Sequence, residues 1–441
     1  MRPTRENGCT EYRTLSRRQF LGATAPAALA AVTAPAWLPR VAFARDECTS
    51  RDVIVSIFLR GGADGLTLCV PYAESNYYNL RQEIAVPPPD AGGADAAIDL
   101  DGFFGLPPAL APLTAAYDAG HLALIPASGL RNASRSHFDA QRFVEVGTPN
   151  DPALLTGWLG RHLLTTPPMT PGAVLRAMSL GFALPRALVG SPQALPVPDP
   201  GDFGLTGRPL TENARLGWLI DQYKQVDDPL RAAAENTQAT IDLLEQIDFN
   251  GYVPAGGAVY GDDSFSQSLR AAAALIRAQV GVEAVAVDLG GWDTHDRQGS
   301  LAGMMANVMS TLATGLSAFH ADVFSATANV TVVVVSEFGR TAAQNGSLGT
   351  DHGTGGCMMV MGDHIRGGQV LTRWPGLETE QLYEQRDVKI TIDIRDILAE
   401  ILQHRLGNAN LAAVFPDYTP KYRGVTTCVP RMDADAQAVD P

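Results

Sequence analysis

The segment NVTVVVVSEFGRTAAQNGSLGTDHGTGG, residues 329–356, decides the fold of this chain. It opens with a run of β-branched residues from Val330 to Val335 that suits burial on both sides of a strand. Such a run is typical of a central strand in a parallel sheet, where both faces are covered. Polar residues follow directly, and ligands of open α/β sheets bind at the carboxyl ends of the strands. The segment therefore predicts a buried strand with a functional site at its end.

Strands and helices alternate on either side of this segment, which is typical of an α/β protein. Strands are predicted at 52–59, 121–126, 174–179, 187–189, 283–289 and 356–361. Helices are predicted at 108–119, 137–146 with Ser136 as N-cap, 158–164, 211–247 with a break near Pro229, 264–280, 301–324 and 393–406 with Asp393 as N-cap.

The first 44 residues predict a twin-arginine export signal. Arg17 and Arg18 lie in SRRQFL, an Ala-rich apolar stretch continues to about Trp37, and an Ala-x-Ala motif ends at Ala44. A transmembrane anchor is the weaker alternative because the apolar run is short and interrupted by proline. The expected partner during export is the Tat translocon. The mature protein is expected in the periplasm or outside the cell, with no stable membrane anchor after cleavage.

The remaining residues are enough for one large domain. The chain has 441 residues, of which 46% are hydrophobic, and a formal net charge of −14. We expect a single domain over residues 45–430, with an elaboration at about 149–260 and a disordered tail at 431–441. The acidic balance argues against a nucleic-acid partner.

Four cysteines remain after the signal: Cys48, Cys69, Cys357 and Cys428. In an oxidising compartment they permit two disulfides, with three pairings open. Four free thiols are an equal alternative, because Cys69 and Cys357 lie in apolar, strand-like runs.

Four polar clusters follow four of the predicted strands. They are Asp64, Ser136 with His137, Asp293 with His295, and Glu337 through His352. Because strand ends meet at one sheet edge, we expect these clusters to converge. Mixed carboxylates and imidazoles suit Zn or Mn, and oxygen ligands would suit Ca or Mg. A hydroxyl at a helix N-terminus, beside a metal, predicts phosphoryl or sulfuryl transfer from an anionic ester.

Each cluster also has a structural interpretation. Asp64 after two glycines would form an Asx-turn, and Ser136 would serve only as a helix cap. Asp293 and His295 would belong to a turn. The remaining histidines are interpreted as structural; they are His121, His162, His320, His364 and His404.

The motifs SRRQFL, FLRGGADGLTLCVPY, RSHFDAQ, GGWDTH and SEFGRT followed by GTDHGTGG resemble the exported bacterial family known as domain of unknown function 1501 (DUF1501). That family is in turn similar to the alkaline phosphatase and sulfatase superfamily. The resemblance implies an alkaline-phosphatase-like α/β fold, with a mainly parallel central sheet, helices on both faces and one or two divalent metal ions.

Carried over to this chain, the superfamily pattern implies a nucleophile and two sets of metal ligands. Ser136 matches the nucleophile, with Ser134 as the alternative. Asp293, His295 and His352 match the ligands of one metal, although one residue separates Asp293 from His295 where phosphatases have three.

The other metal would bind Asp64, Ser136 and Glu337, with His137 or Asp351 as additional ligands. This oxygen-rich set favours Mg, Ca or Mn over Zn. Phosphatases have Asp-His where this chain has Glu337-Phe338, so one imidazole is lost.

The resemblance and the residues together predict an exported, metal-dependent hydrolase of phosphate or sulfate esters. Arg340 is expected to bind the substrate's anionic oxygens through its bidentate guanidinium group. Formylglycine sulfatases need Cys or Ser, then Pro two residues on and Arg two after that. No such motif follows the second predicted strand, which disfavours a formylglycine sulfatase. The alternative is a non-catalytic, secreted binding or matrix-associated protein.

Overall fold

The computed structural model describes residues 51–131, 134–203, 212–223, 225, 230–325 and 329–427. These residues belong to one compact unit. The predicted export signal, Cys48, Cys428 and the tail at 431–441 lie outside them. In the part of the chain that is described, no helix is long and apolar enough to span a membrane.

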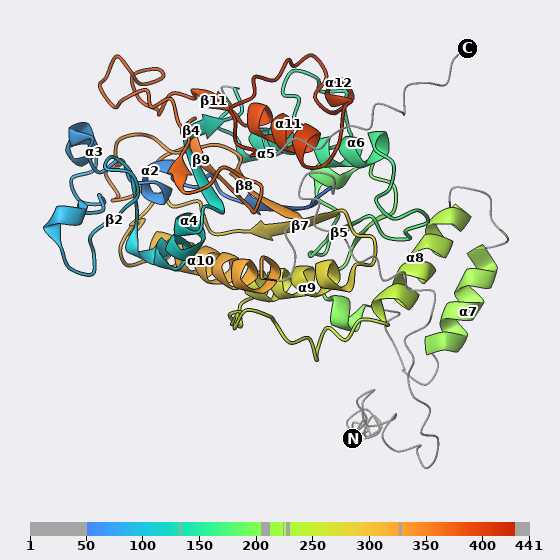
Figure 1. Ribbon diagram of the computed structural model, residues 1–441. Helices are drawn as coiled ribbons and strands as arrows, with labels where there is room; N and C mark the ends of the chain where they lie inside the picture. Colours follow the sequence, from blue (N-terminus) through green and yellow to red (C-terminus); the bar gives the residue numbers. More distant parts are fainter. Residues whose placement is uncertain are drawn as a thin grey trace, which may run out of the picture. The chain divides into compact units, whose positions relative to one another are not determined.

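A nine-stranded sheet runs through the described part of the molecule (Figure 1). Its order is β10-β4-β9-β8-β1-β7-β5-β6, and β11 also pairs with β4. The strands are β1 (Val53–Leu59), β4 (Leu122–Gly129), β5 (Ala177–Ser179), β6 (Ala194–Pro196), β7 (Ala284–Leu289), β8 (Val330–Ser336), β9 (Gly356–Gly362), β10 (Gln369–Val370) and β11 (Ile392–Asp393). A separate pair consists of β2 (Ile98–Asp99) and β3 (Gly105–Leu106).

The prediction of a mainly parallel sheet is confirmed. β1 lies between β7 and β8 and is parallel to both. β9 is antiparallel to its two neighbours, β8 and β4. β9 follows β8 through a loop without a crossover helix, so it runs back from the edge at which β8 ends.

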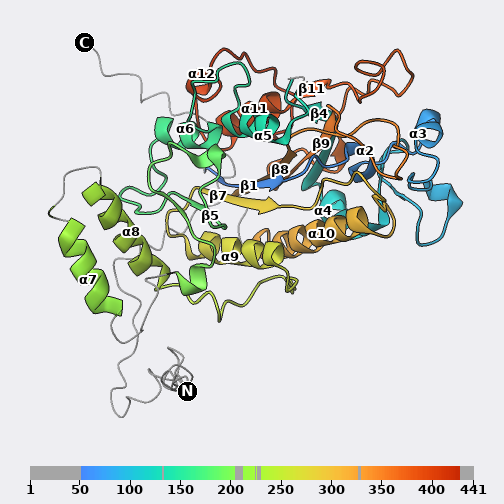
Figure 2. The same ribbon diagram turned by 180° about the vertical axis from the view of Figure 1, so that it is seen from behind.

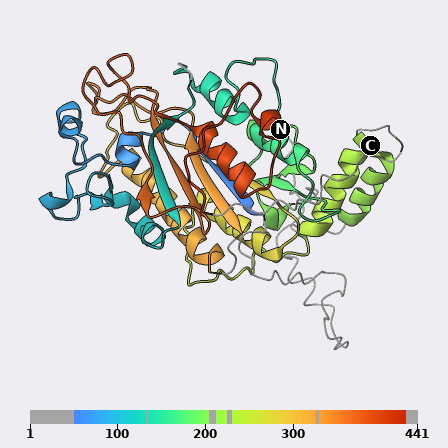
Figure 3. The same cartoon turned by 45° about the horizontal axis from the view of Figure 1, so that its top comes forward.

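Helices cover both faces of the sheet, as predicted (Figures 1 and 2). α9 and α10 lie on one face, and α5, α6 and α11 lie on the other; Figure 3 shows α11 over the strands. The helices are α2 (Gly65–Leu68), α3 (Ser75–Leu80), α4 (Thr114–Asp118), α5 (His137–Val146), α6 (Trp158–Thr165), α7 (Glu212–Tyr223), α8 (Leu230–Leu244), α9 (Ser264–Ala278), α10 (Met304–Val323), α11 (Ile394–His404) and α12 (Leu411–Val414). The 3-10 helices are η2 (Pro89–Ala91), η3 (Pro108–Leu113), η4 (Arg186–Leu188) and η5 (Pro200–Asp202).

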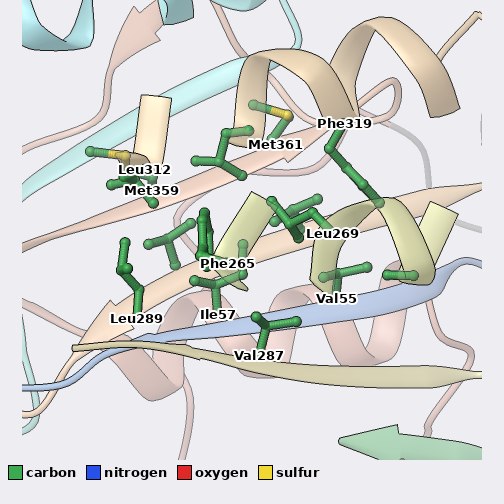
Figure 4. Packing of buried hydrophobic residues seen from close by; sticks show 14 of the residues in the cluster. Val55, Ile57, Phe265, Leu269, Val287, Leu289, Leu312, Phe319, Met359 and Met361 are labelled. Carbon is green, nitrogen blue, oxygen red and sulfur yellow. The ribbon is translucent and has the colours of Figure 1, made fainter. Parts of the chain in front are cut away.

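The central strands supply side chains to two hydrophobic cores. In β1, Val55 and Ile57 face the core beneath α9 and α10, whereas Ile54 and Phe58 face the opposite core. Figure 4 shows residues of the first core, with Phe265 of α9 among the strand side chains. Because both faces are buried, these strands carry apolar residues at successive positions.

The segment at 149–260 contributes to the sheet as well as to the surface. β5 and β6 extend one edge of the sheet through a parallel pairing. The strand predicted at 187–189 is wrong, because η4 covers most of it. β6 was not predicted; its three residues include Pro196, and so short a run carries little strand signal.

Two of the four cysteines lie among the described residues. Cys69 and Cys357 are both buried and are free thiols. Burial and the neighbouring Cys357 raise the pKa of the Cys69 thiol well above its usual value. These two residues therefore match the free-thiol alternative.

Candidate metal centre

Polar residues from several strand ends meet at one edge of the sheet. Asp293 and His295 follow β7, and Glu337 follows β8. His137 begins α5, the helix after β4, and His352 lies just before β9. Since β9 is antiparallel, residues that precede it reach the same edge as residues that follow β4 and β8. The structure thus brings these five side chains together.

Three imidazoles converge on one carboxylate oxygen. The Nε2 atoms of His295, His352 and His137 lie 3.0, 3.2 and 3.5 Å from Asp293 Oδ1. The Nε2 atoms of His295 and His352 are 2.9 Å apart. We call these four residues the His–Asp cluster. Asp293 is half exposed, so the cluster opens to solvent.

The other ring nitrogen of each imidazole has its own acceptor. Nδ1 of His352 donates to a main-chain carbonyl, which can only accept. The other two Nδ1 atoms face carboxylates whose pKa is lowered, so both acceptors are ionised at neutral pH. The pairs are His137 with Glu337 at 2.9 Å, His295 with Asp351 at 3.1 Å, and His352 with the Arg135 carbonyl at 2.8 Å.

These contacts fix the tautomer of the rings. A neutral imidazole that donates from Nδ1 keeps a lone pair on Nε2. Burial lowers the pKa of His352, which favours its neutral form. Two lone pairs 2.9 Å apart, next to an ionised carboxylate, repel one another unless a cation lies between them. His137 Nε2 is buried and accepts no hydrogen bond.

The donor chemistry of the cluster fits a divalent cation. The ligand atoms of His137, Asp293 and His352 all lie within 4.8 Å of one another. His295 joins this trio through its contacts with Asp293 and His352. Hydrogen bonds from Nδ1 to carboxylates or carbonyls are the usual support of histidines that bind metals through Nε2.

Asp293 is held in its ionised form. Although partial burial opposes ionisation, the hydrogen bond and the positive charge of Arg340 lower the pKa of Asp293 to about 2. Arg340 Nη2 lies 2.7 Å from Asp293 Oδ1. The carboxylate therefore retains its charge across the physiological pH range.

Arg340 does not take the role predicted for it. Its side chain is fully buried and donates to the carbonyls of Gly61, Gly62, Trp292 and Thr350 as well as to Asp293. A guanidinium group enclosed by carbonyl oxygens cannot also grip a substrate from solvent. The predicted role of Arg340 in binding the substrate is therefore corrected. Its hydrogen bonds connect three loops next to Asp293.

Asp64 is also placed elsewhere than predicted. It is buried in a bidentate ion pair with Arg81, with distances of 2.5 and 2.9 Å. Thr67 and Gln298 donate to the same carboxylate at 2.6 and 2.8 Å. Burial opposes its ionisation, but Arg81 lowers its pKa overall. With both oxygens engaged, Asp64 is part of a buried ion pair and not of the His–Asp cluster.

Glu337 supports the cluster from behind. Its carboxylate accepts hydrogen bonds from Gly61 N, His137 Nδ1, Gln141 Nε2 and Ser336 Oγ, at 2.8 to 3.0 Å. Its oxygens are therefore occupied by donors, and Glu337 orients His137 instead of facing Asp293. In the same way, Asp351 accepts a hydrogen bond from His295 Nδ1 and orients that ring.

Phe338 packs against the imidazoles. Its ring centroid lies 4.9 Å from that of His137 and 4.8 Å from that of His352. The aromatic ring therefore supports two of the three imidazoles of the cluster.

Ser136 is exposed at the N-cap of α5, directly before His137, and its hydroxyl makes no capping hydrogen bond. Its N-cap position is as predicted. Ser134, the alternative nucleophile, lines a cavity of about 10 Å³ with Glu337 and Phe338, which has room for about one water.

Some residues of the site were missed or ranked too low. His137 is predicted only as an additional ligand, yet its Nε2 lies 3.5 Å from Asp293 Oδ1 and belongs to the cluster. The sequence held a signal for this role, since Gln141 lies four residues later on the same face of α5 and both contact Glu337. No sequence pattern indicated that Arg81 would pair with Asp64, because the two residues lie in separate short segments that meet only in the folded protein.

The fold and the site together define a mainly parallel α/β protein with a cluster of three histidines and one aspartate at the carboxyl edge of its sheet. Residues 224–414 match the family model described as "Protein of unknown function (DUF1501)". This match confirms the resemblance to that family, and it includes every residue of the cluster except His137. No curated protein matches the chain.

Two solved structures are similar to this chain. The structure of Ps i-CgsB in complex with k-i-k-neocarrahexaose is 11% identical, with 86% of this chain and 76% of that chain covered and a TM-score of 0.35. Alkaline phosphatase from the Antarctic bacterium TAB5 is 10% identical, with 72% and 93% covered and a TM-score of 0.28.

Proposed function

We propose that this protein is a metal-dependent hydrolase of phosphate or related esters such as sulfates. The observation that carries the proposal is the convergence of three imidazole Nε2 atoms on Asp293 at a solvent-open sheet edge, with the exposed Ser136 directly before His137 in the chain. A divalent cation bound there would supply Lewis acidity toward the ester oxygens and lower the pKa of a nucleophile.

The N-terminus of α5 suits an anionic group. α5 begins at His137, and the first amides of a helix lack partners within the helix and carry partial positive charge. An ester anion next to the His–Asp cluster would therefore meet main-chain donors as well as the cation.

Ser136 is the proposed nucleophile. Its Oγ would form a bond to phosphorus or sulfur while the bond to the leaving oxygen breaks. The serine proton passes to solvent, and the leaving oxygen takes a proton from solvent. Water then hydrolyses the seryl ester and restores the hydroxyl. The exposure of Ser136, without a capping contact, leaves Oγ free for this step.

A neighbouring cleft would hold the rest of the substrate. It has a volume of about 600 Å³ and is lined by Arg60, Glu145, Phe182 and Asp288 among others. Arg60 connects to the cluster through hydrogen bonds from Arg60 to Gln141 and from Gln141 to Glu337. A cleft of this size fits a small organic group.

The experiment is a substitution of Ser136 by Ala, assayed on an aryl phosphate and an aryl sulfate. We expect turnover to fall by roughly a thousandfold or more, because the covalent step is lost, while the metal content stays unchanged. Ser134→Ala is the matched control and should keep its turnover. Full activity of Ser136→Ala, or loss only in Ser134→Ala, would contradict the assignment.

A second function, secreted binding without turnover, is favoured by one feature. Phe338 and the Asp64–Arg81 ion pair stand where the superfamily pattern has metal ligands. A purified protein that carries its cation and binds phosphate, but turns over neither aryl ester, would support this alternative over the hydrolase.

A further inference from the structure

We propose that the His–Asp cluster binds a single divalent cation of the zinc class, and that the second cation of a two-metal centre has no site in the described part of this chain. The inference deepens the proposed function, because it specifies the cofactor of that site. It depends on the contacts that the structure gives to the three residues expected to hold the other metal, which are Asp64, Ser136 and Glu337.

Asp64 already has a permanent cation, the guanidinium group of Arg81. Arg81 and Asp64 are both essentially inaccessible to solvent, and both carboxylate oxygens receive an Arg81 nitrogen. Arg81 is itself held by the carbonyls of Thr341 and Ala342, both at 2.9 Å. A buried charge pair with complete hydrogen bonding does not release one partner to a metal without a large loss of stability.

Glu337 and Ser136 do not form a second site either. Glu337 is buried, and four protein donors surround its carboxylate. Ser136 is exposed, and no contact joins its hydroxyl to Asp64 or Glu337 in the described structure. The oxygen-rich ligand set expected from the sequence is therefore divided among three separate environments.

What remains is rich in nitrogen. Three imidazole Nε2 atoms lie within 3.5 Å of one carboxylate oxygen, Asp293 Oδ1. Zinc takes histidine nitrogens together with a carboxylate in four-coordinate sites, whereas Mg and Ca require mostly oxygen ligands. The arrangement selects a borderline-soft cation and corrects the expectation of an Mg, Ca or Mn site built on Asp64 and Glu337.

The first test is the number and kind of ions bound by the full mature protein. The protein is stripped with a chelator and titrated with Zn²⁺ and, separately, with Mg²⁺, and bound metal is counted by elemental analysis. We expect one zinc per chain, which excess Mg²⁺ does not displace. Two tightly bound ions per chain, no zinc, or displacement by Mg²⁺ would each overturn the inference.

The second test makes the same change at both aspartates. Asp293→Asn should weaken zinc binding by more than about tenfold, because the cation loses its charged ligand. Asp64→Asn should leave zinc affinity unchanged and lower only thermal stability. Loss of zinc from folded Asp64→Asn would overturn the inference, and if that variant does not fold, the ion count of the unmodified chain decides.

These outcomes are separate from those of the proposed function. A protein that binds one zinc and hydrolyses no ester would keep this inference and overturn the hydrolase. A protein that hydrolyses esters with two bound metals would support the hydrolase and overturn the single-cation inference.

Discussion

At the scale of single residues, the sequence predicted that polar side chains lie at the strand ends, but it predicted the roles of only some of them. Asp293, His295 and His352 lie together, as their positions after or before strands indicated. The sequence predicts Asp64 and Arg340 as parts of the site, because acidic and basic residues at strand ends suit binding. Their actual partners, Arg81 and four loop carbonyls, depend on tertiary packing that local sequence does not encode.

The buried position of Arg340 leads to a prediction about stability. Arg340→Lys would keep the charge but lose the planar set of donors that joins the carbonyls of Gly61, Trp292 and Thr350. We expect the free energy of unfolding to fall by about 2–4 kcal/mol, since hydrogen bonds from charged groups contribute about 1.5–3 kcal/mol each.

Chemical denaturation measures this loss, and Arg297→Lys, at an arginine whose side chain is 82% exposed, is the matched control. If Arg340 instead contacted substrate, its replacement would raise KM for an aryl phosphate and leave unfolding unchanged.

At the scale of elements, long periodic segments were predicted and short ones were not. The strand at 330–335 and the helices α9, α10 and α11 lie close to their predicted bounds, because each has an extended apolar pattern. Asp393 caps α11 as predicted, since its side chain accepts from Arg395 N. The two-residue strands β10 and β11 depend on pairing with β4, for which a single sequence gives no signal.

Helix α6 is attached by polar contacts that are sensitive to acid. His162, on this helix, is buried and accepts a hydrogen bond from Asn408 Nδ2 at 3.0 Å. Burial, with Arg51 and Arg176 nearby, lowers the pKa of His162 to about 3 from its ordinary 6.5. The folded state therefore holds this ring neutral over a pH range in which the unfolded chain protonates it.

This difference predicts a loss of stability in acid. Below pH 6.5 the unfolded state binds the proton more readily, so stability falls by about 1.4 kcal/mol per pH unit until the folded pKa is reached. His162→Gln removes the titrating group and should show a shallower decline in the free energy of unfolding between pH 6.5 and 4. Equal slopes for the two proteins would show that His162 does not contribute.

At the scale of the whole molecule, the fold class was predictable because it depends on composition and alternation, which the chain displays throughout. The antiparallel direction of β9 was not, because an apolar strand reads the same in either direction. The location of the protein rests on residues 1–44, which precede the described part of the chain, and we propose that it is exported through the Tat pathway.

The export proposal is tested by changing Arg17 and Arg18 together to Lys. We expect the variant to remain in the cytoplasmic fraction of a cell with an active Tat system, because the pathway requires the arginine pair. The control changes Arg2 and Arg5 to Lys and should be exported normally. Export of both variants to the same extent would exclude the twin-arginine signal.

If the cluster binds zinc as proposed, the reversal of β9 makes zinc binding depend on the completion of folding. His137 and Glu337 are 200 positions apart, and Asp293 and His352 are 59 apart, so only Asp293 and His295 are neighbours before the sheet forms. An unfolded chain would hold zinc weakly, and by mass action a free ion at a hundred times its Kd would add about 2.7 kcal/mol to the stability of the native state. Bound zinc would then mark folded molecules and be absent from unfolded ones. Chelators would lower the stability of the folded protein by removing the ion.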